Sequence, residues 1–177
     1  MIDPGTNPTG EEFEAYNQRR WGGSGWTRDL KTQGRKIGAT FQNWKWWPHT
    51  LKAHQLVLYS QDKGVDSHTS NAAIFHALYE DGVNVSLVEE LVKIGVHDLG
   101  LGEDCEEELK MYLEQDYGAE EVKREIERGR RRYDISGVPF FIVEREGGGG
   151  GGRPYGFSGA QSSSTFCRIF EELYAEE

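Results

Sequence analysis

A proline that directly precedes a short apolar segment is the feature that most constrains the fold of this chain. Residues 136–143 read Ser-Gly-Val-Pro-Phe-Phe-Ile-Val, so Pro139 stands at the start of four apolar residues. Because proline has no backbone N–H, it fits the first residue of a strand better than a position inside one. The pattern predicts a tight Gly-Val-Pro turn that leads into a strand at 140–143. The Val138–Pro139 bond in such a turn is a candidate for the cis form.

The residues after this strand predict a hairpin and a terminal helix. Six consecutive glycines at 147–152 indicate a long, flexible hairpin tip. The second strand is expected near 155–157. It is followed by Ser158-Gly159-Ala160-Gln161 and by a helix that starts near Ser162.

The middle of the chain is predicted to be helical. Apolar residues recur at helical spacing in five segments, near 48–62, 71–80, 86–94, 104–117 and 119–133. Capping boxes are expected at three helix starts, with the first residue of each box at Thr9, Ser86 and Asp104. Residues 26–47 show no clear period, and we expect 41–47 to be extended. Helices followed by a hairpin and a helix indicate an α+β fold, or a thioredoxin-like fold with a helical insertion.

Charge and composition argue against several classes of partner. The net charge of −10 on 177 residues disfavours nucleic acids and anionic membranes. No apolar run approaches the roughly 20 residues that a membrane-spanning helix requires, and residues 1–10 contain no apolar signal-peptide core. The basic run at 128–132 follows several glutamates on the same expected helix, so we interpret it as an internally paired, solvated face.

Neither of the two cysteines is expected to be a nucleophile. Cys105 and Cys167 lie far apart in the sequence and form no disulfide framework, which favours a reducing, cytoplasmic compartment. Carboxylates adjacent to Cys105 oppose formation of its thiolate. Cys167 stands beside an apolar stripe of the last helix and is expected to be a buried or half-buried small apolar residue. The five histidines show no metal-ligand spacing, and no metal site is predicted.

Three tryptophans within four positions suggest an aromatic surface. Trp44, Trp46 and Trp47 cannot all point inward from one extended segment, because side chains alternate between its two faces. One interpretation places these rings beneath the helices as core. The other has one or two of them line an apolar groove beside Pro139, and at least one ring is expected to be partly exposed.

Several of these motifs resemble the FrnE-like branch of the DsbA family. The most specific are Gly137-Val138-Pro139-Phe140-Phe141 and the Ser-Gly-Ala-Gln segment at 158–161. Residues 48–54, Pro-His-Thr-Leu-Lys-Ala-His, are similar to the Pro-Asn-Thr-x-x-Ala-His of that branch, with His49 where asparagine is usual. Residues 73–82 look like a helix of its inserted α domain.

The resemblance implies an α/β, thioredoxin-like fold with an inserted all-α domain. Residues 1–47 would be a remnant linking segment of the thioredoxin-like domain, 48–135 the inserted helical domain, and 136–177 the C-terminal hairpin and helix. In the family, a strand, a Cys-x-x-Cys at the start of a helix and a second strand come before the segment that begins near Asp3. The sequence contains no Cys-x-x-Cys. We therefore expect an N-terminally incomplete member that lacks the N-terminal β-α-β unit.

The same resemblance implies a thiol–disulfide oxidoreductase domain that keeps the cis-proline half of the site, which binds substrate. Its expected substrate-binding residues are Gly137, Val138, Pro139, Trp47 and His49, and the main chain of Val138 would pair with a substrate strand. The implied partner is a protein or small molecule that contains a thiol or a disulfide. No catalytic residue is assigned and no cofactor is expected, so the chain alone is predicted to be inactive.

Two alternative functions stay open. One is a glutathione-dependent transferase or isomerase of the kappa-class and 2-hydroxychromene-2-carboxylate isomerase type, with glutathione as its cofactor. The Ser-Gly-Ala-Gln segment at 158–161 favours the FrnE-like branch over this one. The other alternative is a non-catalytic module that binds peptides.

Overall fold

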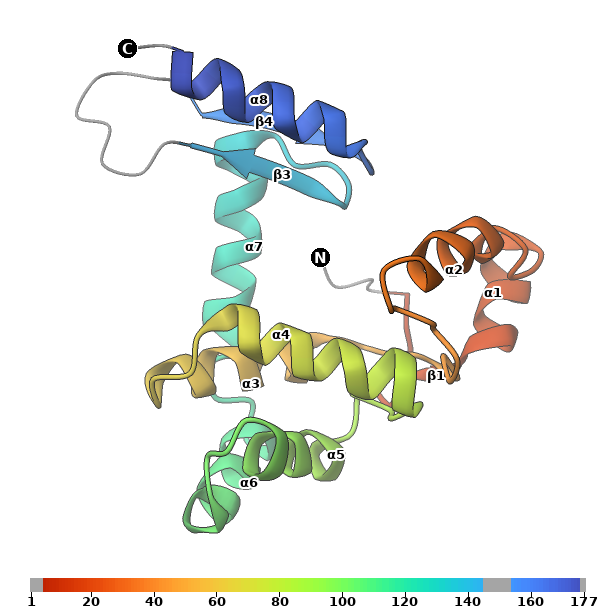
Figure 1. Cartoon of the computed structure of the whole chain (residues 1–177). Helices are drawn as coiled ribbons and strands as arrows, with labels where there is room; N and C mark the ends of the chain where they lie inside the picture. Colours follow the sequence, from red (N-terminus) through yellow and green to blue (C-terminus); the bar gives the residue numbers. More distant parts are fainter. Residues whose placement is uncertain (1–4, 145–153, 176–177) are drawn as a thin grey trace. The chain divides into compact units, whose positions relative to one another are not determined.

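The computed structural model describes residues 5–144 and 154–175 and separates the chain into two compact units (Figure 1). The helical unit holds the described residues up to Lys123, and the C-terminal unit holds those from Arg124 onward. The long helix α7, Ala119–Tyr133, crosses this boundary. Its sequence-predicted bounds agree with the structure.

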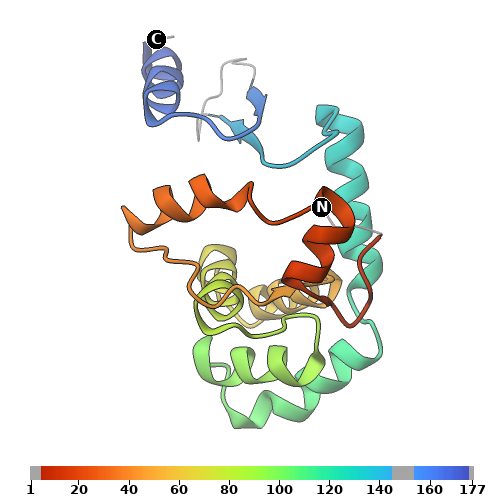
Figure 2. The same cartoon turned by 90° about the vertical axis from the view of Figure 1, so that its right-hand side faces the viewer.

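The helical unit is built around helix α3, Leu51–Asp62. Helix α3 packs against α4, α5 and α6 (Figures 1 and 2). The bounds of these elements are Ser67–His76 for α4, Ala77–Asp81 for the π-helical turn η1, Val88–Lys93 for α5, Ile94–Asp98 for the π-helical turn η2, Glu103–Cys105 for the 3₁₀ turn η3 and Glu106–Glu114 for α6. Apolar periodicity predicted that these segments are helical. The helix ends in the structure differ from the predicted ends.

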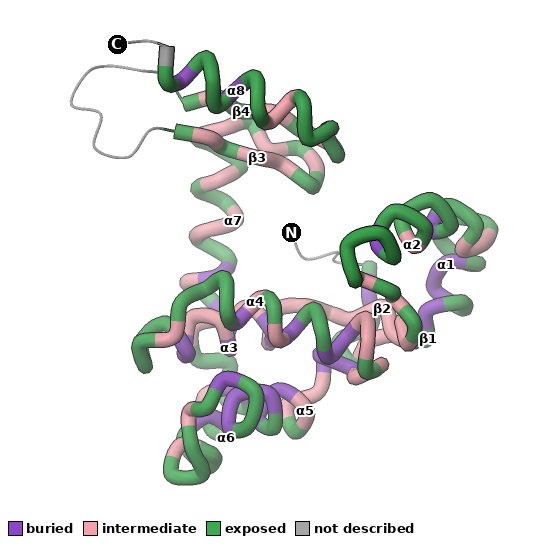
Figure 3. Tube along the Cα trace, in the orientation of Figure 1, coloured by how far each residue is buried: buried purple, intermediate pink, exposed green. Residues whose placement is uncertain are grey.

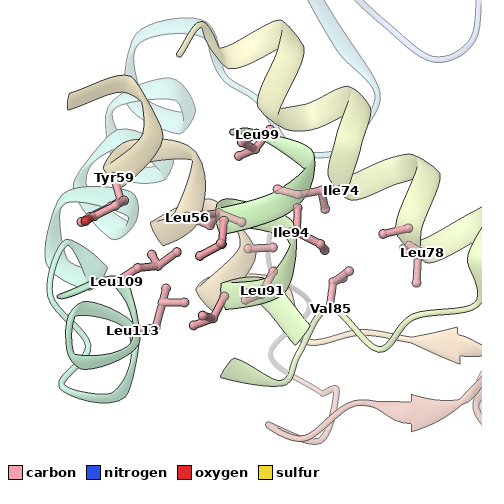
Figure 4. Packing of buried hydrophobic residues seen from close by; sticks show 14 residues of the cluster. Leu56, Tyr59, Ile74, Leu78, Val85, Leu91, Ile94, Leu99, Leu109 and Leu113 are labelled. Atoms are coloured by element: carbon pink, nitrogen blue, oxygen red, sulfur yellow. The ribbon is translucent and has the colours of Figure 1, made fainter. Parts of the chain in front are cut away.

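Leucines from three of these helices form the centre of the core (Figure 4). Leu56 of α3, Leu91 of α5, and Leu109 and Leu113 of α6 are completely buried, and buried residues concentrate along these helices (Figure 3). Each such side chain contributes about 1.5–3 kcal/mol by leaving water. Gly95 permits this close packing, since a Cβ at that position would lie 2.5 Å from Cδ2 of Leu109.

The three predicted capping boxes are wrong, because other groups cap or precede these helices. Glu12, not Thr9, caps α1, and its carboxylate accepts from the N–H of Ala15 at 2.7 Å. The Ser86 hydroxyl instead accepts from the N–H of His49 at 2.9 Å. The 3₁₀ turn η3 precedes α6, so Asp104 is not at a cap. Helix α4 begins earlier than predicted, because the side chain of Asp66 accepts from the N–H of Thr69.

Two short helices and a minimal sheet form the N-terminal part of the helical unit. Helix α1, Phe13–Trp21, ends at Gly22, whose φ of 73° is left-handed. Helix α2, Thr27–Arg35, was not predicted, because its residues are mostly polar and show no apolar period. Strand β1, Glu11–Glu12, pairs antiparallel with β2, Trp46–Trp47, in the register Glu11 with Trp47 and Glu12 with Trp46.

Aromatic contacts connect residues 41–47 to α1 and to η1. The centroid of the Trp44 ring lies 4.5 Å from that of Phe13 on α1 and 4.9 Å from that of Tyr79 in η1. The N–H of Asn43 donates to the carbonyl of Tyr79 at 3.1 Å. Trp46 packs against the leucine core. All three tryptophans of this segment are half-buried, so the expectation that at least one ring is partly exposed is confirmed.

The C-terminal unit contains a hairpin and a helix. Strand β3, Phe140–Val143, pairs antiparallel with β4, Tyr155–Ser158, in a register that places Phe141 opposite Phe157. Helix α8, Ser163–Ala175, contributes Phe166, whose ring packs on both phenylalanines at centroid distances of 5.1 and 5.4 Å. The Val138–Pro139 bond is cis, as expected from the Gly-Val-Pro turn. The glycine tract at 147–152 lies outside the described residues.

Among the helices in the described part of the chain, none is both long and apolar enough to cross a membrane.

The Glu80 carboxylate holds the segment before β2 and is predicted to make stability depend on pH. It accepts hydrogen bonds from the Thr40 hydroxyl and from the N–H of Phe41, the latter at 2.8 Å. These bonds, chiefly the one from Thr40, lower the pKa of Glu80 below its ordinary value of 4.5. The stabilisation is therefore present above pH 4.5 and is lost as the pH falls through the lower pKa of the folded state.

We expect Glu80→Gln to lower the free energy of unfolding at pH 7 and to have a shrinking effect below pH 4.5. Urea unfolding of both proteins at a series of pH values measures this difference. Glu114→Gln, at an exposed carboxylate of α6, is the control and should leave the pH dependence unchanged. An effect of Glu80→Gln that is constant from pH 7 to pH 3 contradicts the prediction.

Candidate functional site

The predicted binding residues are divided between the two units. Gly137, Val138 and Pro139 belong to the C-terminal unit, whereas Trp47 and His49 belong to the helical unit.

The turn before β3 exposes main-chain groups. The Val138 residue is 61% exposed, and a Cβ at Gly137 would meet nothing within 4 Å. The carbonyl of Pro139 accepts from the N–H of Gly159 at 2.9 Å, which ties the turn to the end of β4. Neither the N–H nor the C=O of Val138 bonds to any residue that the structure describes. The turn thus holds a main-chain donor and acceptor that are not used within the described residues.

His49 lies just before α3 and is half-buried. Its main-chain N–H donates to the hydroxyl of Ser86 at 2.9 Å, so it links the start of α3 to the loop before α5. This contact is made by the main chain and does not involve the imidazole.

Trp47 lines an open hollow of about 640 Å³ in the helical unit. The lining consists of Trp47 with two further tryptophans and three glycines of the turn between α1 and α2, namely Trp21, Gly22, Gly23, Gly25 and Trp26. Trp21 and Trp26 were not among the residues predicted for a binding site. Their signal was present in the Trp-Gly-Gly-Ser-Gly-Trp run at 21–26, where a glycine-rich turn separates two large aromatic residues.

Buried polar and aromatic contacts fix two of the three indole rings. The Trp26 N–H donates to the amide oxygen of Asn17 at 2.8 Å, and the Asn17 amide nitrogen donates to the carbonyl of Phe13 at 2.8 Å. Asn17 is completely buried. The Trp47 ring stacks on Tyr16 at 4.3 Å with an interplanar angle of 9°. The hollow is therefore largely preformed.

The two cysteines lie in different units, and both thiols are free. Cys105 is half-buried at the N-cap of α6, and Cys167 is exposed on α8. The expectation that Cys167 is at least half-buried is wrong. The apolar face of α8 runs through Phe166, Ile169 and Leu173, and a residue next to Phe166 is rotated about 100° away from it.

The basic run at 128–132 forms ion pairs on the surface of α7. Arg128 and Arg131 form ion pairs with Glu125 at 2.5 Å and Glu127 at 2.8 Å, so the internally paired face is confirmed. Within the described residues, no group of three or more His, Cys, Asp or Glu side chains could hold a metal ion.

Comparison with known families identifies the class of this protein. Residues 25–170 match the family model of the DSBA-like thioredoxin domain. Because the match covers most of the chain, the protein belongs to this family, which is of the thiol–disulfide oxidoreductase type. Its helices and short strands fit an α/β, thioredoxin-like fold. No curated protein matches the sequence.

Replacement of Asn17 is expected to loosen the wall of the hollow. Asn17→Ala removes the acceptor of the Trp26 N–H and a donor to the carbonyl of Phe13, and should lower the free energy of unfolding by roughly 1–3 kcal/mol. We also expect a red shift of tryptophan emission, because the Trp26 ring becomes more hydrated. Urea unfolding and emission spectra measure both effects.

Gln18→Ala is the matched control, since Gln18 is the exposed neighbour of Asn17 on α1. An Asn17→Ala protein with the stability and emission of Gln18→Ala would show that the Asn17–Trp26 hydrogen bond is unimportant.

Proposed function

We propose that this chain provides the substrate-binding side of a thiol–disulfide oxidoreductase of the FrnE-like branch. The observation that carries the proposal is the exposed Val138, whose N–H and C=O bond to no residue in the described part of the chain. An extended substrate segment can pair with these two groups as an added strand. The resemblance of Gly137–Phe141 and of residues 158–161 to that branch supports the same role.

This pairing would position a substrate sulfur for exchange. In thiol–disulfide exchange, a thiolate attacks one sulfur of a disulfide, a mixed disulfide forms, and the other sulfur leaves as a thiolate. Main-chain pairing beside the sulfur reduces the motion that must be lost before this attack. The proposed partner is a protein or small molecule with a thiol or disulfide, met in a reducing, cytoplasmic compartment. No cofactor takes part.

The two cysteines of the chain are not proposed to perform the exchange. They form no Cys-x-x-Cys, and Cys105 is followed by three glutamates, Glu106, Glu107 and Glu108. A reactive cysteine typically lies in an electropositive environment, which is the opposite of this one. A non-catalytic peptide-binding module is the second candidate function, favoured by an exposed Val138 in a sequence without Cys-x-x-Cys.

If Val138 pairs with an extended peptide, the affinity of the peptide should depend on the one amide that pairs with Val138. The probe is a blocked octapeptide with a central S-methylcysteine between β-branched residues, titrated into the ¹⁵N-labelled chain. We expect the Val138 amide signal to shift. N-methylation of the amide that pairs with Val138 should weaken binding roughly tenfold, because one main-chain hydrogen bond is lost and the methyl group clashes.

N-methylation near the end of the same peptide is the control and should change affinity little. Trp47→Ala and His49→Ala proteins show in the same titration whether these two residues contribute. Equal affinity of the two methylated peptides, or an unperturbed Val138 signal, would refute the pairing.

The chain alone is expected to lack dithiol oxidoreductase activity. Reduction of insulin by dithiothreitol should proceed at the same rate with and without the purified protein, and Cys105→Ser and Cys167→Ser should change nothing. An acceleration that Cys167→Ser abolishes would assign the exchange to Cys167. Turnover that requires added glutathione would favour the glutathione-dependent alternative.

A further inference from the structure

We propose that the hollow lined by Trp21, Trp26 and Trp47 binds a planar aromatic carboxylate. This site lies entirely in the helical unit and includes none of the residues of the turn at Val138. The inference does not depend on the proposed function.

The shape of the hollow suits a flat ring. Its volume of about 640 Å³ lies within the range of small-molecule sites. The Trp26 and Trp47 rings meet at 76° with centroids 6.5 Å apart, so they offer two walls nearly at right angles. Ser24 is the only residue with a side chain in the turn at 22–25. A Cβ at Gly22 or Gly25 would meet nothing within 4 Å. A ring can therefore approach one indole face and contact the other ring at its edge.

The walls are held before any ligand arrives. Trp26 is bonded to the buried Asn17, and Trp47 is stacked on Tyr16 and paired with Glu11 in the β1–β2 ladder. Trp21, which is 55% exposed, is the wall that a ligand would cover most. Preformed walls reduce the entropy that binding must overcome.

Three donor groups lie at the hollow or on its Trp21 wall. The indole N–H groups of Trp21 and Trp47 bond to no residue that the structure describes. The guanidinium carbon of Arg20 lies 4.4 Å from the centroid of the Trp21 ring, and no described carboxylate forms an ion pair with Arg20. Glu14, on the same helix as Arg20, accepts from the Ser24 hydroxyl at 3.0 Å. A ligand that brings acceptor atoms and negative charge would satisfy these donors.

The local charge favours an anion over a cation. Residues 5–47 contain seven Lys and Arg but four Asp and Glu, whereas the whole chain has a net charge of −10. Three tryptophans could in principle hold an ammonium group through cation–π attraction. The Arg20 guanidinium already lies over the Trp21 ring, so it would repel such a group. It would instead pair with a carboxylate, which matches its planar donors.

Calorimetric titration of the 177-residue chain with three naphthalenes tests the proposal. The probes are 2-naphthoate, 2-naphthylmethylammonium and 2-naphthalenemethanol, which share one ring system and differ in charge. We expect saturable binding of 2-naphthoate that is about tenfold tighter than binding of the cation, since the ionic contact to Arg20 reverses its sign. Equal or tighter binding of the cation would overturn the assignment, as would no binding of 2-naphthoate at millimolar concentration.

Substitutions in and beside the hollow test whether 2-naphthoate binds there. Gly25→Val should fill the hollow, Trp21→Ala should remove a wall, and Arg20→Gln should remove the cation, each weakening 2-naphthoate binding about tenfold. The controls are Phe75→Ala, at an aromatic residue that is also 55% exposed, and Arg35→Gln on α2. Both should bind as the wild type does. An equal loss in the controls would place the ligand elsewhere.

A measurement on the wild-type protein covers the case in which a variant fails to fold. In ¹⁵N spectra, 2-naphthoate should shift the indole N–H signals of Trp21 and Trp47 more than that of Trp44, which already donates to the carbonyl of Trp46 at 3.0 Å. If the Trp44 signal shifts most, the hollow is not the binding site. The octapeptide titration at Val138 is read from a different unit, so failure of one proposal is distinguishable from failure of the other.

Discussion

Apolar burial around α3 is the interaction on which the helical unit depends. Leu56 occupies the point where α3 meets α5 and α6, and its side chain is completely removed from water. Because Gly95 has no side chain, the turn η2 can approach Leu109 closely enough to close this core. The short helices are too brief to be stable alone. Their order therefore follows from the leucine contacts and not from helix propensity.

The walls of the aromatic hollow are positioned by residues that pack on this core. Trp46 packs on the leucine cluster, and its neighbour Trp47 points into the ring stack with Tyr16, as alternation along a strand requires. Pairing of β1 with β2 then fixes α1, whose last residue is Trp21. Asn17 completes the arrangement by holding Trp26 across the glycine turn. One extended segment at 41–47 thus connects the core to the hollow.

The spacing of apolar residues along the chain predicted the elements that are held by apolar burial. It did not predict the helix or the helix caps that depend on polar contacts. Helices α3 to α7 and the β3–β4 hairpin were predictable, since their buried positions repeat at 3.6 or 2 residues. Helix α2 was not, because Leu30 is its only large apolar residue and is itself 43% exposed. The capping box at Ser86 failed because its hydroxyl accepts from the N–H of His49, a partner distant in sequence. The turn at Val138 was found from the sequence. The run at 21–26 signals two walls of the hollow, but the third wall, Trp47, is brought there by pairing with Glu11 across the β1–β2 ladder, which no local pattern encodes.

The negative net charge disfavours a nucleic acid but not a single carboxylate, because the two respond to charge over different distances. A nucleic acid presents many phosphates, so its binding requires a basic surface that extends over many contacts. A net charge of −10 disfavours such a partner. A single carboxylate responds to charges within about 8 Å, the screening length at physiological ionic strength. Beside the hollow, the Arg20 guanidinium carbon lies 4.4 Å from the centroid of the Trp21 ring. An acidic protein can therefore carry an anion site, provided that the site is small, is lined by aromatic rings and lies beside a cation such as Arg20.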